Sequence, residues 1–385
     1  MGDWRTGGFG LYLHWPFCQS KCPYCDFNSH VAANIDQNRW QTAYMAEIRR
    51  IGDQTPGRVL NSVFFGGGTP SLMRPELVAA ILDKVRATWT MANDVEITME
   101  ANPSSVEAAR FVGYHEAGVN RVSIGMQALR DDDLRRLGRM HSVAEAKLAY
   151  DIARKTFDRV SFDLIYSRQD QSQADWQSEL KEALAMEPSH LSLYQLTIED
   201  GTVFGARHAL GQLRGLPDED LSSDMYLATQ DMCEAAGLPG YEISNHAKPG
   251  QESRHNLIYW RMGDYVGIGP GAHGRLTLGR QRWATEAPKQ PGAWLGLVES
   301  GVAGEDPRTT NSRADQAAEY LLMSLRLREG SDERRFRALA GHDLPAAKIT
   351  ELQEAGLLER AGSFIKTTRP GRLLLNAILR ELLVN

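Results

Sequence analysis

A sixfold alternation of short apolar runs with helix-like segments restricts the fold of this chain more than any other feature. The runs are rich in β-branched and aromatic residues and lie at Leu11–His14, Ser62–Phe65, Glu96–Glu100, Arg121–Met126, Val160–Ile165 and His190–Gln195. Helical patterns occur near residues 37–52, 75–89, 105–117, 143–156 and 173–186. Strands that alternate with helices form parallel sheets with right-handed crossovers. The sequence therefore predicts an α/β fold whose sheet curls into a partial (β/α)6 barrel.

Residues with unusual chemistry or conformation follow these predicted strands. Pro16-Phe17-Cys18 follows the first strand, and the glycine-rich segment 66–70 follows the second. The third strand ends in the segment 100–103, the fourth runs into Gln127, and the fifth contains Asp163. In α/β barrels the carboxyl ends of the strands carry the chemistry. We therefore expect one shared site at this end of the barrel.

Three of the four cysteines lie within eight residues, at Cys18, Cys22 and Cys25, with the spacing C-x₃-C-x₂-C. Clustered cysteines in a cytosolic chain indicate metal more often than disulfides. Three thiolates on one loop can bind three irons of a [4Fe–4S] cubane and leave the fourth iron open. S-adenosylmethionine (SAM) can take this open position through its amino and carboxylate groups.

A structural zinc site is the alternative interpretation of the cysteine loop. Such a site needs four ligands, often from two CxxC pairs. The second pair is missing here, although His14 and His30 lie close by, and the strand context favours the cluster. The fourth cysteine, Cys233, falls in a helical pattern and is expected to be an ordinary buried thiol.

Composition and charge place the chain among globular proteins. The net charge of −6 argues against nucleic-acid binding. No apolar run approaches 18 residues and the N-terminus lacks a secretory pattern, so we expect a cytoplasmic protein. A peripheral membrane contact is compatible with this sequence.

The pattern of residues also predicts the domain organisation. We expect the partial barrel with its site over residues 1–240 and a glycine- and aromatic-rich segment that closes the barrel over 241–283. Residues 284–312 are rich in proline, glycine and polar residues and are expected to be a linker. Residues 313–385 are expected to form a small helical or winged-helix-like domain, with a strand-turn-strand near Leu358–Thr367.

The order of these motifs resembles the radical-SAM superfamily. The segment Tyr12–Cys18, together with Gly66–Pro70 and Glu100–Pro103, is similar to the family of oxygen-independent coproporphyrinogen III dehydrogenase and its relatives. The resemblance covers nearly the whole chain, including the C-terminal domain. It implies a partial (β/α)6 radical-SAM barrel that binds a [4Fe–4S] cluster and SAM.

Carried over by position, the resemblance assigns cluster or SAM contacts to Tyr12, Tyr24, Gly67, Gly68, Thr69, Glu100, Gln127, Arg139 and Asp163. It implies that Tyr24 lies near the adenine and that the Gly67–Thr69 backbone meets the methionyl amino group. It also implies that Glu100 accepts a hydrogen bond from SAM, Arg139 holds the SAM carboxylate, and Asp163 holds the ribose. The residues alone leave other roles open: a strand-to-helix turn for the glycines, a turn cap for Glu100 and a solvated surface position for Arg139.

Three features argue against the dehydrogenase itself and resemble the haem chaperone branch of this family. The dehydrogenase has a fourth cysteine two places after the third, where this chain has Phe27, and only 17 residues precede Cys18. The segment His255–Trp260 (HNLIYW) matches the HNxxYW pattern of the chaperone branch. Histidine can ligate haem iron, and Tyr259 and Trp260 can pack against the porphyrin. The alternative is that these side chains only close the edge of the barrel.

Two further segments bear on haem and substrate contacts. His273, within Tyr265–Gly274, is a second and weaker candidate for the haem ligand. The segment Ser167–Gln171 departs from the Gly-Leu-Pro-Gly-Gln that relatives often have after the fifth strand. Substrate contacts from this loop are therefore in doubt.

The resemblance implies a haem chaperone that binds haem, the cluster and SAM, and transfers haem to an acceptor protein such as a respiratory enzyme. Oxidative decarboxylation of coproporphyrinogen III is the alternative, and radical-SAM chemistry on another substrate is a third. An electron donor such as flavodoxin or ferredoxin is required if SAM is cleaved. The sequence leaves open whether SAM is consumed and whether the chain is a monomer or a dimer.

Overall fold

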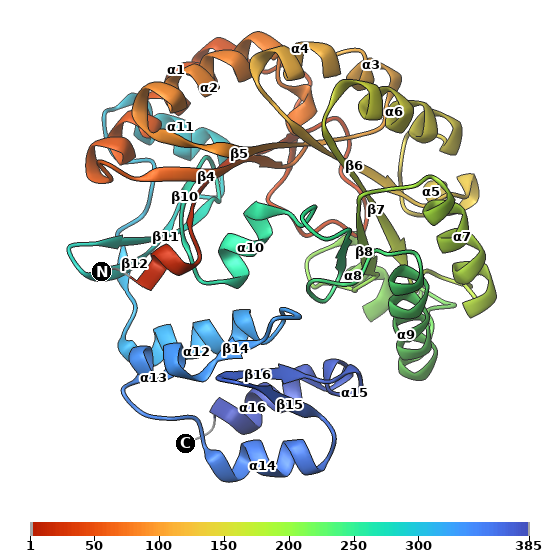
Figure 1. Ribbon diagram of the computed structural model, residues 1–385. Helices are drawn as coiled ribbons and strands as arrows, with labels where there is room; N and C mark the ends of the chain where they lie inside the picture. The colour runs from red at the N-terminus through yellow and green to blue at the C-terminus, as the bar shows by residue number, and fades with distance from the viewer. Residues whose placement is uncertain (1–2, 384–385) are drawn as a thin grey trace.

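The computed structural model describes residues 3–383, and its main feature is one open, curved sheet (Figure 1). The strands lie in the order β13-β12-β11-β10-β1-β4-β5-β6-β7-β8-β9. The parallel strands are β1 (Phe9–Trp15), β4 (Val59–Gly67), β5 (Thr90–Ala101), β6 (Arg121–Gln127), β7 (Arg159–Tyr166), β8 (His190–Gln195) and β10 (Asp264–Ile268). All six strands predicted from the sequence are present and adjacent, so the partial barrel is confirmed.

Short antiparallel strands extend the sheet at both ends. β9 (Asn245–Ala247) pairs with β8, whereas β11 (His273–Leu278), β12 (Gln281–Glu286) and β13 (Thr309–Thr310) follow β10. The segment 241–283 therefore supplies strands to both ends of the sheet, and these ends do not pair with each other.

Helices follow the parallel strands, and most of them cover the outer face of the sheet (Figure 1). They are α1 (Gln37–Gln54), α2 (Pro75–Thr88), α3 (Ser105–Ala108), α4 (Phe111–Ala117), α5 (Asp131–Arg136), α6 (Val143–Thr156), α7 (Gln173–Ala185), α8 (Val203–Ala209) and α9 (Glu219–Ala235). Ser142 and Ser172 start α6 and α7 through capping boxes, which satisfy the first free N–H groups of each helix. The helix expected over 105–117 is divided into α3 and α4.

The segment 284–312, expected to be a linker, is folded into the barrel domain. It contains α11 (Pro291–Glu299), whose Trp294 is 0 % exposed and stacks on Trp40 of α1 with ring centroids 5.4 Å apart. Pro291 fits the first turn of this helix, and Leu295 and Val298 complete its buried face. The expectation was wrong because the proline, glycine and polar residues around α11 obscured a short apolar face.

α10 (Arg254–Trp260) lies on the inner side of the curved sheet (Figure 1). The buried Glu96 carboxylate accepts hydrogen bonds from the backbone N–H groups of Arg254 and His255, each at 3.2 Å. Arg159 donates to the same carboxylate at 2.7 Å. Because these bonds satisfy N–H groups at the start of α10, Glu96 fastens the HNxxYW helix to the barrel interior.

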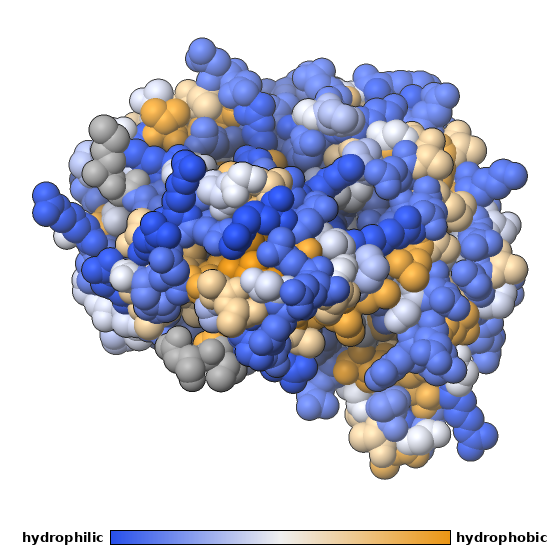
Figure 2. Space-filling view, turned by 60° about the horizontal axis from the view of Figure 1, so that its bottom comes forward, coloured by the Kyte–Doolittle hydropathy of each residue, from blue (hydrophilic) through white to orange (hydrophobic). Residues whose placement is uncertain are grey.

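The C-terminal domain has a hydrophobic core of its own. On the surface that Figure 2 turns towards the viewer, hydrophobic side chains lie between hydrophilic ones. The domain contains α12 (Arg313–Ser324), β14 (Ser331–Asp332), α13 (Glu333–Ala340), α14 (Ala346–Glu354), β15 (Leu358–Ala361), β16 (Phe364–Thr367), α15 (Arg369–Leu373) and α16 (Leu375–Leu383). The strand-turn-strand expected near residues 358–367 is confirmed as β15 and β16. Within residues 3–383, no helix combines the length and the apolar character needed to cross a membrane.

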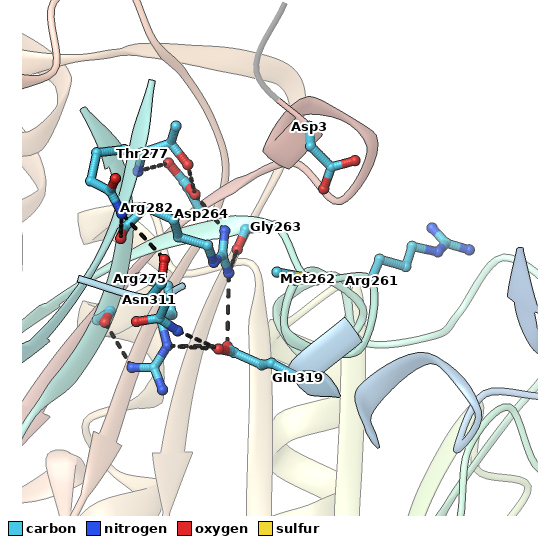
Figure 3. A network of polar contacts seen from close by, with 12 residues as sticks. Asp3, Arg261, Met262, Gly263, Asp264, Arg275, Thr277, Arg282, Asn311 and Glu319 are labelled. Carbon is cyan, nitrogen blue, oxygen red and sulfur yellow. Dashed lines mark hydrogen bonds and ion pairs between the residues drawn. The ribbon is translucent and has the colours of Figure 1, made fainter. Parts of the chain in front are cut away.

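A network of charged side chains joins this domain to strands β10, β11 and β12 of the sheet (Figure 3). Asp264 of β10 is 0 % exposed and accepts hydrogen bonds from Arg58 at 2.7 Å and Arg282 at 2.9 Å. Glu319 of α12 pairs with Arg275 at 3.1 Å and lies 3.9 Å from Arg282. The buried ion cluster of the sheet therefore continues into the first helix of the C-terminal domain.

Candidate functional site

A cavity of about 1310 Å³ opens at the carboxyl ends of the parallel strands. The residues expected from the sequence that line it are Cys18, Cys22, Tyr24, Cys25, Gly67, Gly68, Thr69, Glu100, Gln127, Arg139 and Asp163. Most of them come from the cysteine loop and from β4 to β7 or the turns that follow, and Arg139 comes from the connection between α5 and α6. The topology therefore gathers side chains that are distant in sequence. This is the end of the sheet at which α/β barrels carry their chemistry.

The cysteine loop is closed by a short pairing of β2 (Phe17–Cys18) with β3 (His30–Val31). The Thr69 hydroxyl donates a hydrogen bond to Cys18 Sγ at 3.4 Å, which joins the loop to the glycine-rich turn. Burial raises the pKa of the Cys18 and Cys25 thiols. An iron cluster that binds here therefore displaces thiol protons, as metal binding by cysteine generally does.

The donors present fit a multi-iron cluster. The three thiols line one cavity. A cubane accepts one thiolate for each of three irons and does not require the sulfurs to meet at one point. Gly68 also fits this close packing, because a Cβ there would lie 2.7 Å from the Phe17 carbonyl oxygen and 3.0 Å from Cys18 Sγ.

Arg139 places a positive charge beside the cysteine loop. Its guanidinium lies 3.4 Å from Cys22 Sγ and donates to Asn102 Oδ1 at 2.7 Å and to the Gly125 carbonyl at 3.1 Å. The interpretation of Arg139 as a solvated surface arginine is therefore wrong. An arginine fixed in this way can offer its remaining N–H groups to a carboxylate.

Asn102 is a site residue to which the sequence analysis gave no role. Its side chain holds Arg139 and also donates to Thr69 Oγ1 at 3.3 Å. The available signal was its position two residues after Glu100, directly beyond the end of β5. Asn102 thus links the guanidinium to the glycine-rich turn.

Two acidic side chains, Glu100 and Asp163, line the cavity together with the cysteine loop. We call this part of the cavity, between the cysteine loop and the ends of β5 to β7, the inner cavity. The Gly67 N–H donates to Glu100 at 3.2 Å, and Ser123 Oγ donates to Asp163 at 3.3 Å. Burial and the nearby Asp163 raise the pKa of Glu100 to about 8, and burial raises the pKa of Asp163 to about 6. A ligand that brings a cationic group or hydroxyl donors would stabilise the ionised carboxylates, and SAM has both.

Gln127 ends β6 with a φ of 69°, in the left-handed region that favours glycine. Such a conformation costs on the order of 1–3 kcal/mol and is found most often at functional sites. The register of β6 against β7 also shifts between Ile124 and Gln127. The backbone irregularity places this glutamine in the cavity lining.

We expect Glu100→Gln to remove a pH dependence of stability. Above about pH 4.3, the Glu100 carboxyl ionises in the unfolded chain, whereas in the folded chain it keeps its proton until about pH 8. This group therefore makes the free energy of unfolding fall as the pH rises across that window. In urea titrations of the cofactor-free protein, the difference in the free energy of unfolding between the variant and wild type should shift in favour of the variant by about 1 kcal/mol or more from pH 5 to pH 8. If the free energy of unfolding changed with pH in the same way in both proteins, the raised pKa of Glu100 would be contradicted.

Tyr12, His255, Tyr259 and Trp260 do not line this cavity. His255 is 5 % exposed, with its ring stacked on Phe64 at a centroid distance of 4.2 Å and an edge contact to Tyr259 at 4.6 Å. Tyr12 stacks on His255 at 5.9 Å, and its hydroxyl lies 2.9 Å from His14 Nδ1. Burial lowers the pKa of His255 to about 3, so its imidazole is neutral. In this arrangement the histidine of the HNxxYW pattern packs inside the barrel.

Of the two remaining segments singled out from the sequence, the one with His273 lies apart from the cavity, whereas the divergent loop 167–171 contributes Ser167 to the cavity lining. His273 is exposed at the start of β11, 3.7 Å from Glu286. In the divergent loop 167–171, Arg168 is buried and pairs with Asp133 at 2.8 Å and Glu179 at 2.6 Å. These ion pairs fasten the loop to α5 and α7, which gives its different sequence a structural role.

Comparisons with known proteins agree with this geometry. A model of the radical SAM superfamily matches residues 12–180, and a model of the HemN C-terminal domain matches residues 311–374. A solved structure described as coproporphyrinogen III oxidase (HemN) from Escherichia coli aligns with a TM-score of 0.82 and 21 % identity, over 97 % of this chain and 90 % of that one. At this identity the alignment shows the fold alone.

Curated relatives match the chain over nearly its full length. The protein named heme chaperone HemW from Escherichia coli K12 is 39 % identical over 374 residues, which cover 96 % of each chain. The Haemophilus influenzae heme chaperone HemW is 37 % identical, again over 96 % of each chain. The mitochondrial radical S-adenosyl methionine domain-containing protein 1 from Bos taurus is 36 % identical, over 97 % of this chain and 87 % of the relative. The chain therefore belongs to the HemW family of radical SAM proteins.

Proposed function

We propose that this protein is a haem chaperone. It binds a [4Fe–4S] cluster through Cys18, Cys22 and Cys25, binds SAM in the inner cavity, and binds haem for transfer to an acceptor protein. The observation that carries the proposal is that the cysteine loop, Arg139 and the two half-buried acids Glu100 and Asp163 line one cavity. The chain that forms this cavity matches the HemW proteins over nearly its full length. When bound, the cluster and SAM supply one-electron chemistry.

The residues of the inner cavity complement the different parts of SAM. Arg139 offers N–H donors to the carboxylate, while the backbone of Gly67–Thr69 runs close enough to the cysteine loop to meet the amino group. Glu100 and Asp163 offer acceptors to the ammonium and to the ribose hydroxyls, and Tyr24 offers an aromatic face to the adenine. These assignments place SAM between the cysteine loop and the ends of β5 to β7.

Phe27 favours the chaperone over the related dehydrogenase. It occupies the position of the fourth cysteine of that enzyme, and 61 % of its side chain is exposed beside the cluster loop. An aromatic ring provides neither a ligand nor a thiol for redox chemistry.

The partners and the compartment follow from the same proposal. A reduced cysteine loop requires a compartment that keeps thiols reduced, so we place the protein in the cytoplasm. We propose a haem-binding respiratory enzyme as the acceptor and a flavodoxin or ferredoxin as the electron donor in case SAM is cleaved.

Two assays on anaerobically purified, cluster-reconstituted protein test this function. We expect haem to bind, as followed by its absorption band, and we expect no protoporphyrinogen IX from coproporphyrinogen III with SAM and a reductant. Product formation at rates typical of enzymes, about 1 s⁻¹ or more, would instead assign the dehydrogenase activity. Failure of the wild-type protein to bind haem would refute the chaperone.

His255→Ala decides the role of the HNxxYW histidine in the same titration. The burial of the ring leads us to expect that the variant binds haem and unfolds at lower denaturant concentration than wild type. Loss of haem binding with unchanged unfolding would identify His255 as the haem ligand instead.

A further inference from the structure

The cavity continues well beyond the residues assigned to SAM. A site for one drug-sized ligand measures about 300–1,000 Å³. The volume of about 1310 Å³ exceeds this range, and the lining extends from the cysteine loop to Arg372 and Leu373 of α15 and Asn376 of α16. The C-terminal domain therefore forms part of a second, outer compartment of the same cavity.

The walls of the outer compartment combine apolar and aromatic side chains with polar ones, among them the acids Glu199, Asp218 and Glu219. The apolar and aromatic side chains are the part of the wall that a macrocycle can contact. They include Tyr194, Leu196, Leu216, Tyr226, Ile243 and Leu373. Tyr194 and Leu373 are exposed although both are large, and they come from β8 of the barrel and α15 of the C-terminal domain. Such walls fit the faces of a large, flat, apolar ligand.

Arg372 is the cation of this compartment. Guanidinium carries five N–H donors, of which Arg372 uses one for the Glu242 carbonyl oxygen at 3.2 Å, and the group also lies beside the Tyr226 side chain. Among the ion pairs within residues 3–383, none involves Arg372. Arg369, one turn earlier, is instead paired with Asp231. Arg372 therefore has donors available to a carboxylate that enters the cavity.

We propose that the outer compartment binds a tetrapyrrole and that Arg372 pairs with one of its propionates. This inference rests on the proposed haem-binding function and specifies where haem binds and which residue recognises its acid group. The apolar walls contact the macrocycle, while the guanidinium contacts the carboxylate at the domain boundary. A tetrapyrrole in the outer compartment leaves the inner cavity free for SAM, so the tetrapyrrole and SAM would lie next to each other.

Titration of the reconstituted full-length protein with haemin and with haemin dimethyl ester tests the proposal. The ester keeps the macrocycle and removes both carboxylates. We expect wild type to bind haemin about tenfold more tightly than the ester, because a hydrogen bond to a charged group is lost with the ester. Equal affinities for the two probes would overturn the assignment, without any variant having to fold.

Arg372→Met should weaken haemin binding about tenfold and remove the preference over the ester. Arg372→Lys, which keeps the charge, should restore part of the affinity. Arg369→Met is the matched control, because it changes an arginine of the same short helix that is paired elsewhere, and it should bind as wild type does. Haemin binding by Arg372→Met equal to that of wild type would refute the site and leave the chaperone function intact. No haemin binding by wild type would refute both.

Discussion

Replacing Cys22 with serine is expected to remove the iron–sulfur cluster and, with it, SAM binding in the barrel cavity. Cys22 is the central member of the C-x₃-C-x₂-C loop, and its Sγ lies 3.4 Å from the Arg139 guanidinium. Because three thiolates are the whole protein ligand set that we propose for the cubane, losing one leaves a second iron without a protein ligand. Iron analysis of anaerobically reconstituted protein should fall from about four atoms per chain to a small fraction of that.

Cys233→Ala is the matched control for this experiment. Cys233 is 0 % exposed within α9, as expected from the sequence, and it lies outside the cavity lining. The variant should keep its full iron content and SAM affinity. Iron retained by Cys22→Ser, or zinc in place of iron in the wild-type protein, would contradict the cluster assignment.

The parts of the fold that the sequence predicts are those governed by local patterns. Ser62–Phe65 and Val160–Ile165 are β-branched or aromatic runs bounded by turns, and both lie within strands of the sheet. The residues that follow such runs could be placed together because parallel strands share one carboxyl edge. Cys18, Glu100 and Asp163 were found in this way, and all three line the cavity.

The parts that the sequence does not predict depend on long-range contacts. Three such contacts join residues more than 150 positions apart: the bond from the His255 backbone to Glu96, the stack of His255 on Phe64, and the stack of Trp294 on Trp40. Arg372 lines the cavity only because the C-terminal domain packs over it. Local sequence patterns do not predict contacts of this kind, so the outer compartment could be found only from the structure.

Asp264→Asn is expected to destabilise the protein by about 3–5 kcal/mol, the usual cost of removing one partner from a buried charge network. Asp264 is the carboxylate shared by Arg58 and Arg282, and the side chains of all three are buried. An asparagine keeps the size of the side chain but removes the charged carboxylate that the two guanidinium groups share. The free energy of unfolding should be measured by urea denaturation at neutral pH.

The consequence of this substitution reaches the boundary between the domains. Arg282 also lies 3.9 Å from Glu319 of α12, and Asp264 follows directly on the turn that ends α10 (Figure 3). Loss of the carboxylate should therefore weaken both the packing of β10 and β12 and the attachment of the C-terminal domain that bears Arg372. Asp83→Asn provides the control, because its pair with Arg86 is exposed and such pairs contribute about 1 kcal/mol or less. Equal effects of the two substitutions would show that Asp264 does not stabilise the buried arginines.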